Sequence, residues 1–120
     1  MATMEVKETN WQQFCERFEQ GHRGTLISME SVRHDGTTEL LAADLPLREF
    51  RFEKTQGCSD LIRVLLGENV QHQIIEPIHV RLREEAGARK ILQIDAEAGS
   101  VELRFSSGRL GAMMQEFNLS

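Results

Sequence analysis

Hydrophobic and polar residues alternate most regularly between Ile78 and Phe105. Apolar side chains recur there at every second position in three short segments, which turns containing Gly87 and Gly99 separate. A period of two is the pattern of a strand with one buried face. The stretch therefore predicts a three-stranded antiparallel meander whose apolar face must be covered by another part of the chain. The residues expected on that face are Ile78, Val80, Leu82, Leu92, Ile94, Ala96, Val101, Leu103 and Phe105.

A helical spacing occurs near the amino terminus. Residues 1–8 show no periodicity and are expected to form a loose lead-in. Thr9 or Asn10 can cap the helix that follows, and Gly21 is its expected end. We expect this helix to cover part of the sheet or to close the end of a barrel. Its apolar stripe, at positions i, i+3, i+4 and i+7, consists of Trp11, Phe14, Cys15 and Phe18.

The middle of the chain predicts further strands. A strand is expected at Thr25–Arg33, and the Asp-Gly pair in the turn 34–37 favours a hairpin with a returning strand at Thr38–Ala43. Pro46 lacks a backbone donor, which indicates an edge position, a bulge or a break. Soon after it the apolar residues move from odd positions (Leu45, Leu47) to even positions (Phe50, Phe52). A bulge or kink near Arg48–Glu49 would keep both pairs on the same face of the strand.

The run Leu61–Leu66 is almost continuously apolar and favours a strand buried on both faces, with a helical turn as the alternative. Glu68–Gln73 is polar and predicts no element. Residues 106–120 form a candidate carboxy-terminal helix, although Gly111 weakens it. Its apolar stripe can be core or, at a chain end, an interface for another subunit. This candidate interface consists of Leu110, Met113, Met114 and Phe117.

These elements predict an α+β or mainly β fold. The amino-terminal helix packs on a strongly bent antiparallel sheet or small open barrel of five to six strands. At 120 residues the chain is expected to form one domain over residues 1–120.

Composition excludes several classes of protein. The chain is 40% hydrophobic and 28% charged, which is typical of a folded globular protein. A net charge of -5 without basic runs argues against nucleic-acid binding. No segment has the pattern of a secretory signal or a membrane span. Two widely spaced cysteines suit a reducing compartment, so a cytoplasmic protein is expected.

Candidate chemistry is sparse. The histidines and cysteines do not show the spacing of a zinc site, and no glycine-rich phosphate loop or serine nucleophile motif is present. Cys15 is most simply a small core residue. Cys58 lies in a predicted loop, but no motif supplies it with a base. We therefore expect no catalytic residues, no metal and no cofactor, and hence no enzyme.

One basic stripe is a candidate site for an anion. His79, Arg81, Arg83 and Arg104 fall on the outward positions of the meander, where they could bind an anionic partner. Carboxylates are as frequent on the same strands, so cross-strand charge pairing is the alternative explanation.

Several packing and turn positions share their spacing with known proteins. They are Trp11-x-x-Phe14-x-x-x-Phe18-x-x-x-His22-x-Gly24, then Glu30, and later Ile75-x-Pro77-x-x-Val80-x-Leu82. With these residues the chain resembles a family of short bacterial proteins of unknown function. The family implies no activity. One helix followed by five or six short strands is also the element order of Sm-like small barrels, an analogy of architecture alone.

Three functions follow as hypotheses. The first is a small non-enzymatic interaction or assembly module of a bacterial cytoplasm, with a protein partner or self-association, for which a symmetric dimer is the simplest closure. The second is a small barrel that binds an anionic ligand or nucleic acid through the basic stripe. The third, an enzyme, rests only on Cys58 and scattered carboxylates.

Overall fold

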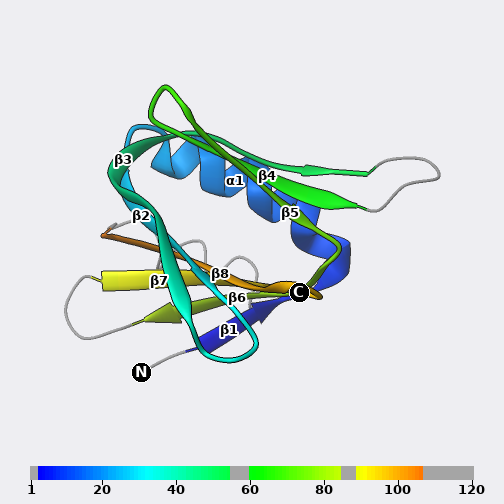
Figure 1. The fold of residues 1–120 in the computed structure, drawn as a ribbon. Coiled ribbons are helices and arrows are strands. Elements are labelled where there is room, and N and C mark those ends of the chain that lie inside the picture. Colours follow the sequence, from blue (N-terminus) through cyan, green and yellow to red (C-terminus); the bar gives the residue numbers. More distant parts are fainter. Residues whose placement is uncertain (1–2, 55–59, 85–88, 107–120) are drawn as a thin grey trace.

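The computed structural model describes residues 3–54, 60–84 and 89–106 (Figure 1). Within these ranges the chain forms eight strands, one α-helix and one short 3-10 helix. In chain order they are β1 Thr3–Val6, the 3-10 helix Glu8–Asn10, α1 Trp11–His22, β2 Leu26–Val32, β3 Thr38–Glu53, β4 Leu61–Leu66, β5 Val70–Ile75, β6 Pro77–Glu84, β7 Arg89–Ala96 and β8 Gly99–Ser106.

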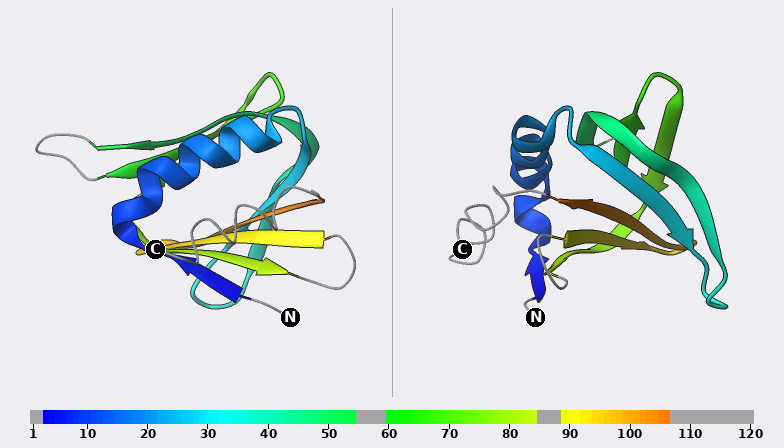
Figure 2. Two further views of the ribbon diagram at one scale, coloured as in Figure 1. Left: turned by 180° about the vertical axis from the view of Figure 1, so that it is seen from behind. Right: turned by 90° about the vertical axis from the view of Figure 1, so that its left-hand side faces the viewer.

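The described strands form one antiparallel sheet in the order β1-β6-β7-β8-β2-β3-β4-β5. β3 belongs to both halves of this sheet, because its first part pairs with β2 and its second part pairs with β4. The strand bends between the two parts. Asp44 has a φ of 49° there, and a register shift separates Leu47 from Glu49. The bend folds the sheet into two layers, which Figure 2 shows from two sides.

The helix α1 connects the two layers through aromatic contacts. Phe14 and Phe18 are fully buried. The ring of Phe18 lies 4.9 Å from that of Phe50 in β3 and 5.2 Å from that of Phe105 in β8, measured between centroids. The expected helix, its apolar stripe and its position over the meander are therefore confirmed.

Much of the expected strand pattern is also confirmed. The meander forms β6, β7 and β8, and the hairpin turn at residues 34–37 joins β2 to β3. The register shift in β3 lies where the sequence predicted a bulge, near Arg48–Glu49. The prediction of burial on both faces of Leu61–Leu66 was wrong, because Leu61, Arg63 and Leu65 are only half-buried.

The predicted five to six strands were too few. The lead-in contains β1, a four-residue strand in which Met4 and Val6 are buried against β6. The polar stretch after Gly67 contains β5, which pairs with β4 along its whole length. Both strands lie at the ends of the sheet order, where pairing on one side and partial burial stabilise segments with little apolar periodicity of their own.

Four local predictions also need correction in whole or in part. The helix continues through Gly21 to His22, and the side chain of Asn10 does not cap it. Of the alternatives for Pro46, the break is wrong, because Pro46 lies inside β3 opposite Leu26, whereas the register shift between Leu47 and Glu49 agrees with a bulge. Ile78 is 52% exposed instead of core, because a register shift follows Pro77 at the start of β6.

The sheet does not close into a barrel. β1 and β5 form its two edges among the described residues, although a single residue, Glu76, joins β5 directly to β6. Glu76 has a φ of 54°, which turns the chain sharply at this corner. In the part of the chain that the structure describes, no helix is long and apolar enough to cross a membrane.

Candidate functional site

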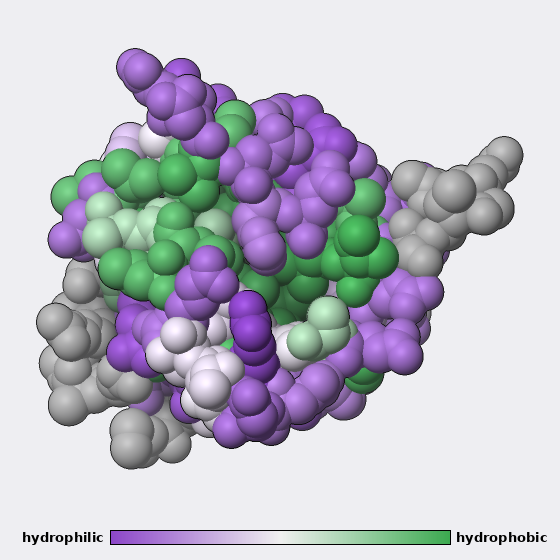
Figure 3. All heavy atoms as spheres, viewed as in Figure 1, coloured by the Kyte–Doolittle hydropathy of each residue, from purple (hydrophilic) through white to green (hydrophobic). Residues whose placement is uncertain are grey.

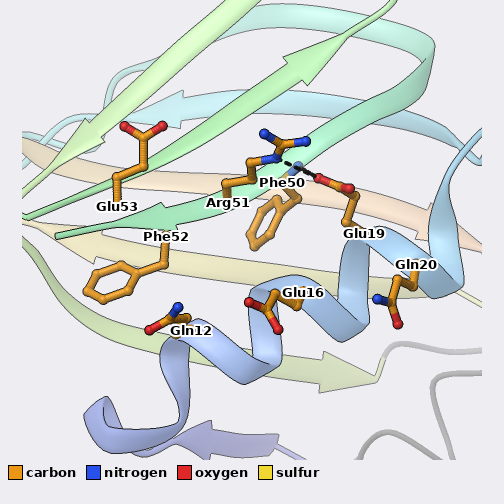
Figure 4. A pocket seen from close by; sticks show the side chains of 8 residues that line it. All are labelled: Gln12, Glu16, Glu19, Gln20, Phe50, Arg51, Phe52 and Glu53. Atoms are coloured by element: carbon orange, nitrogen blue, oxygen red, sulfur yellow. Dashed lines mark hydrogen bonds and ion pairs between the residues drawn. The ribbon is translucent and has the colours of Figure 1, made fainter.

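A cleft of about 340 Å³ lies between α1 and the second half of β3 (Figure 4). This part of β3 pairs with β4 on one side only, since β2 pairs with β3 no further than Pro46. The helix takes the place of a strand at the other side. The cleft is lined by Gln12, Glu16, Glu19, Gln20, Phe50, Arg51, Phe52 and Glu53.

Glu19 is the most constrained side chain of the cleft. One carboxylate oxygen accepts a hydrogen bond of 3.0 Å from the backbone N–H of Phe50 and lies 3.4 Å from Nε of Arg51. The other oxygen lies 2.6 Å from the guanidinium of Arg23. Burial acts to raise the pKa of Glu19, but the bonds from Phe50, Arg23 and Arg51 together outweigh it and lower the pKa. The carboxylate therefore stays ionised and fixes α1 to the free edge of β3.

The rest of the cleft offers little chemistry. Glu53 pairs with Arg63 at 3.1 Å, and the lining contains no cysteine, histidine, serine or threonine that could act as a nucleophile or proton shuttle. Across the described ranges, no group of three or more histidine, cysteine, aspartate or glutamate residues could hold a metal ion. The arrangement around Glu19 is therefore explained by helix docking.

The predicted basic stripe lies on the outer face of the meander, and each member contacts a carboxylate. His79 lies 2.8 Å from Glu5, Arg81 lies 2.6 Å from Asp95, and Arg83 lies 3.2 Å from Glu102. Arg104 shares the carboxylate of Glu102 at 3.1 Å. These ion pairs offset the positive charge that an anion would need. Anion binding by the stripe stays a prediction.

The residues paired with the stripe have altered acidity. The hydrogen bond from His79 lowers the pKa of Glu5. Burial raises the pKa of Asp95, but hydrogen bonds from Gln93 and Ser100, together with the charge of Arg81, outweigh it and lower the pKa. Glu5 and Asp95 are therefore ionised at neutral pH, as cross-strand charge pairing requires.

His22 is a core residue at the end of α1. Its ring is fully buried, stacks on Phe18 at 4.4 Å and meets the edge of Phe105 at 5.1 Å. Its Nδ1 lies 3.0 Å from the carbonyl oxygen of Phe18. The imidazole completes the aromatic cluster between the two layers.

The remaining predicted residues separate into two groups. Cys15 is buried in the core, and burial raises the pKa of its thiol, so it is an unreactive core residue. Cys58 lies outside the described residues. So does the candidate interface of Leu110, Met113, Met114 and Phe117, and both predictions stay open.

A second hollow, of about 230 Å³, lies between β5 and the turn that joins β7 to β8. It is bordered by residues 72–75 of β5, by the turn between β7 and β8, and by Ser31 of β2. Ala96 and Val101 contribute apolar surface, and His72 is half-buried at its rim. Burial lowers the pKa of His72, so its imidazole is neutral at pH 7. We call this hollow the seam groove.

The comparisons with known proteins give a family for the chain. Its sequence matches DUF5335, a family of unknown function, over residues 2–109. The chain belongs to this family. Neither the curated proteins nor the solved structures contain a match. The resemblance that the sequence suggested, to a family of unknown function, is thus confirmed.

In this DUF5335 chain, sequence reasoning missed both hollows. Glu19 follows Phe18 in the helix and looks like an ordinary polar position next to the apolar stripe. Glu19 accepts a hydrogen bond from the backbone N–H of Phe50 because the pairing of β2 with β3 ends before that residue. The seam groove depends on β5, which the sequence did not predict, so no local signal could have revealed it.

Proposed function

We propose that this chain is a non-enzymatic protein-interaction module of a bacterial cytoplasm. The observation that carries the proposal is an exposed apolar surface beside the seam groove. Ile75 and Ile78, on either side of the β5–β6 corner, are 56% and 52% exposed. Figure 3 shows a broad hydrophobic area over β3 that continues beside β5 and is bordered by hydrophilic residues. Apolar surface gathered in this way, with a polar border, is typical of a protein-binding face.

The polar surfaces support the same proposal. The cleft at α1 uses its buried carboxylate to attach the helix, and the outer face of the meander has its arginines paired with carboxylates. Neither surface offers a reactive set of side chains. A reducing cytoplasm agrees with Cys15, which is a free thiol.

Site-specific photocrosslinking in cells that naturally make the chain tests the proposal. A photoreactive amino acid replaces the exposed Gln73 of β5 in one variant and the exposed Gln13 of α1 in a matched control. We expect Gln73 to give a discrete crosslinked product with a protein and Gln13 to give none. Equal labelling from both positions, or no product from Gln73 and from a third variant at Gln71, would contradict the proposed interaction face.

A further inference from the structure

β5 offers an unpaired backbone edge. It pairs with β4 through six consecutive residue pairs, from Leu66↔Val70 to Leu61↔Ile75, without a bulge. No strand lies on its other side within the described ranges. In an antiparallel strand, alternate residues direct their N–H and C=O groups to opposite sides. Half of the backbone groups of β5 therefore point away from β4 and toward the seam groove.

This edge has none of the features that usually keep sheet edges from pairing. Such edges carry lysines or other charges, prolines or bulges. The sequence of β5, Val-Gln-His-Gln-Ile-Ile, contains no proline and no formal charge at neutral pH, because burial keeps His72 neutral. The opposite edge differs. In β1, Glu5 is ionised and bonded to His79 and Arg81. An edge that is uncharged, regular and unpaired by any described strand is suited to pairing with another strand.

The seam groove lies next to this edge. Its volume of about 230 Å³ is below the roughly 300 to 1,000 Å³ of small-molecule sites. A space of this size, lined by Ala96, Val101 and residues of β5, suits alternate side chains of an extended segment. A strand that adds to a sheet edge binds through its backbone and gains specificity from such side-chain positions.

We propose that β5 binds an extended segment of another protein as a ninth strand. The segment has an uncharged centre of residues that favour strands, with lysine or arginine at its ends. This inference rests on the proposed function and specifies its binding mode.

The charges around β5 select the ends of the segment. Glu68 lies just before the strand, and Glu97 lies in the turn that borders the seam groove. Both are exposed, and neither forms an ion pair with a described residue. Acidic groups just before the strand and in the turn beside the seam groove complement a segment with basic residues at its ends.

A second copy of the chain is a poorer occupant. Each copy carries a net charge of -5, so two copies that pair through β5 repel each other. The same charges attract a basic segment.

Selection from a random nine-residue peptide library displayed on phage, with the immobilised full chain as target, tests the inference. We expect enriched peptides with β-branched or aromatic residues in the centre and lysine or arginine at the ends. The strongest is then synthesised with single backbone N-methyl groups. Methylation at every second position should weaken binding more than about tenfold, since it removes a hydrogen bond to β5. Methylation at the intervening positions should change affinity less than about threefold.

Charge reversal supplies a second measurement on the protein itself. The double variant Glu68→Lys with Glu97→Lys should bind the same peptide more than about fivefold more weakly. High salt should reduce this loss of affinity. The matched control, Glu16→Lys on the exposed face of α1, should leave affinity unchanged.

The failures are distinguishable. Absence of enriched peptides, uniform sensitivity to N-methylation, or dimers that form through β5 in light scattering would overturn strand addition. Specific crosslinking from Gln73 would in each case still support the interaction module.

Discussion

The carboxylate of Glu19 accepts a hydrogen bond that a neighbouring strand would otherwise accept. Beyond Leu47 the edge of β3 that faces α1 has no strand partner, and an unsatisfied buried N–H costs about as much as a lost hydrogen bond. Glu19 accepts the bond from Phe50 N–H and is itself paired with Arg23 and Arg51. Glu19 thus provides a hydrogen-bond acceptor for the backbone N–H of Phe50 and fixes the orientation of the helix against β3.

Replacing Glu19 should therefore destabilise the fold. Glu19→Gln keeps the size but loses the charge, and we expect a loss of roughly 1 to 3 kcal/mol in the free energy of unfolding at pH 7. Because the pKa of Glu19 is lowered in the folded state, this contribution is present above about pH 4.5 and is lost as the pH falls through the folded-state pKa. Urea unfolding at pH 7 and pH 3.5 measures both effects. Glu16→Gln, one turn earlier and exposed, is the control and should change stability little.

Gly99 is restricted by its neighbours as well as by its backbone. It begins β8 with a φ of 143°, and a Cβ atom there would lie 2.6 Å from the carbonyl oxygen of Val32. Gly99→Ala should cost about 1 to 3 kcal/mol, because backbone must move. Gly21→Ala is expected to have the opposite effect. Gly21 lies inside α1 with no atom near the added Cβ, so the substitution should stabilise the fold by about 0.5 kcal/mol. Thermal or urea unfolding of both variants, compared with the unchanged chain, tests the pair.

The sequence predicted residues of the core better than polar contacts. Trp11, Phe14 and Phe18 were placed correctly because their spacing alone defines a buried face. Glu19 and His22 follow no such pattern. Their roles come from where β3 bends and where β8 lies, which local spacing does not encode.

At the scale of elements, α1 joins the two layers of the bent sheet. Its aromatic side chains contact both layers, so the layers pack together through the helix.

Phe18 carries most of this contact. Phe18→Ala should lower the free energy of unfolding by roughly 3 to 5 kcal/mol, because a large buried ring is lost between Phe50 and Phe105. Chemical denaturation measures the loss. Gln13→Ala on the exposed face of the same helix is the control. A loss below about 1 kcal/mol would show that the ring is not buried in solution.

Elements with a strong period were predicted and edge elements were not. The meander alternates over three segments and was found with nearly its observed limits. β1 has four residues, and β5 combines two glutamines with a histidine, so neither has a recognisable apolar face. Each exists because a longer strand next to it, β6 or β4, offers hydrogen bonds. Such strands are set by the sheet and not by their own residues.

For the whole molecule, stability should fall with acid in two ranges. The pKa of His72 is lowered by burial, so the fold disfavours its protonated form, and stability declines as the pH falls below about 6.5. The lowered pKa values of Glu19 and Asp95 add a second decline below about pH 4.5. Urea midpoints between pH 3 and 8 measure the profile. His72→Gln should remove the upper decline and keep the lower one, whereas His34→Gln in the exposed β2–β3 turn should keep both. A profile that is flat between pH 5 and 7 in the unchanged chain would contradict the burial of His72.

The overall sheet order was beyond prediction from sequence. Hairpins between neighbouring strands follow from turns, but the pairing of β2 with β8 joins Ser28 to Arg104, across most of the chain. Nothing in either segment specifies the other, and each could pair with any strand of similar pattern. The bent, unclosed sheet follows from this one pairing together with the continuity of β3.

The same pairing constrains how the protein can be made on the ribosome. Synthesis proceeds from the amino terminus, so α1 and β2 emerge long before β8, which provides the ring of Phe105 for Phe18 and the ladder for β2. Until then Phe18 has the ring of Phe50 beside it but lacks that of Phe105. The nascent chain therefore leaves part of the aromatic face of α1 uncovered until β8, the last described strand, leaves the exit tunnel. A chaperone that binds early apolar segments would meet this chain at its first helix.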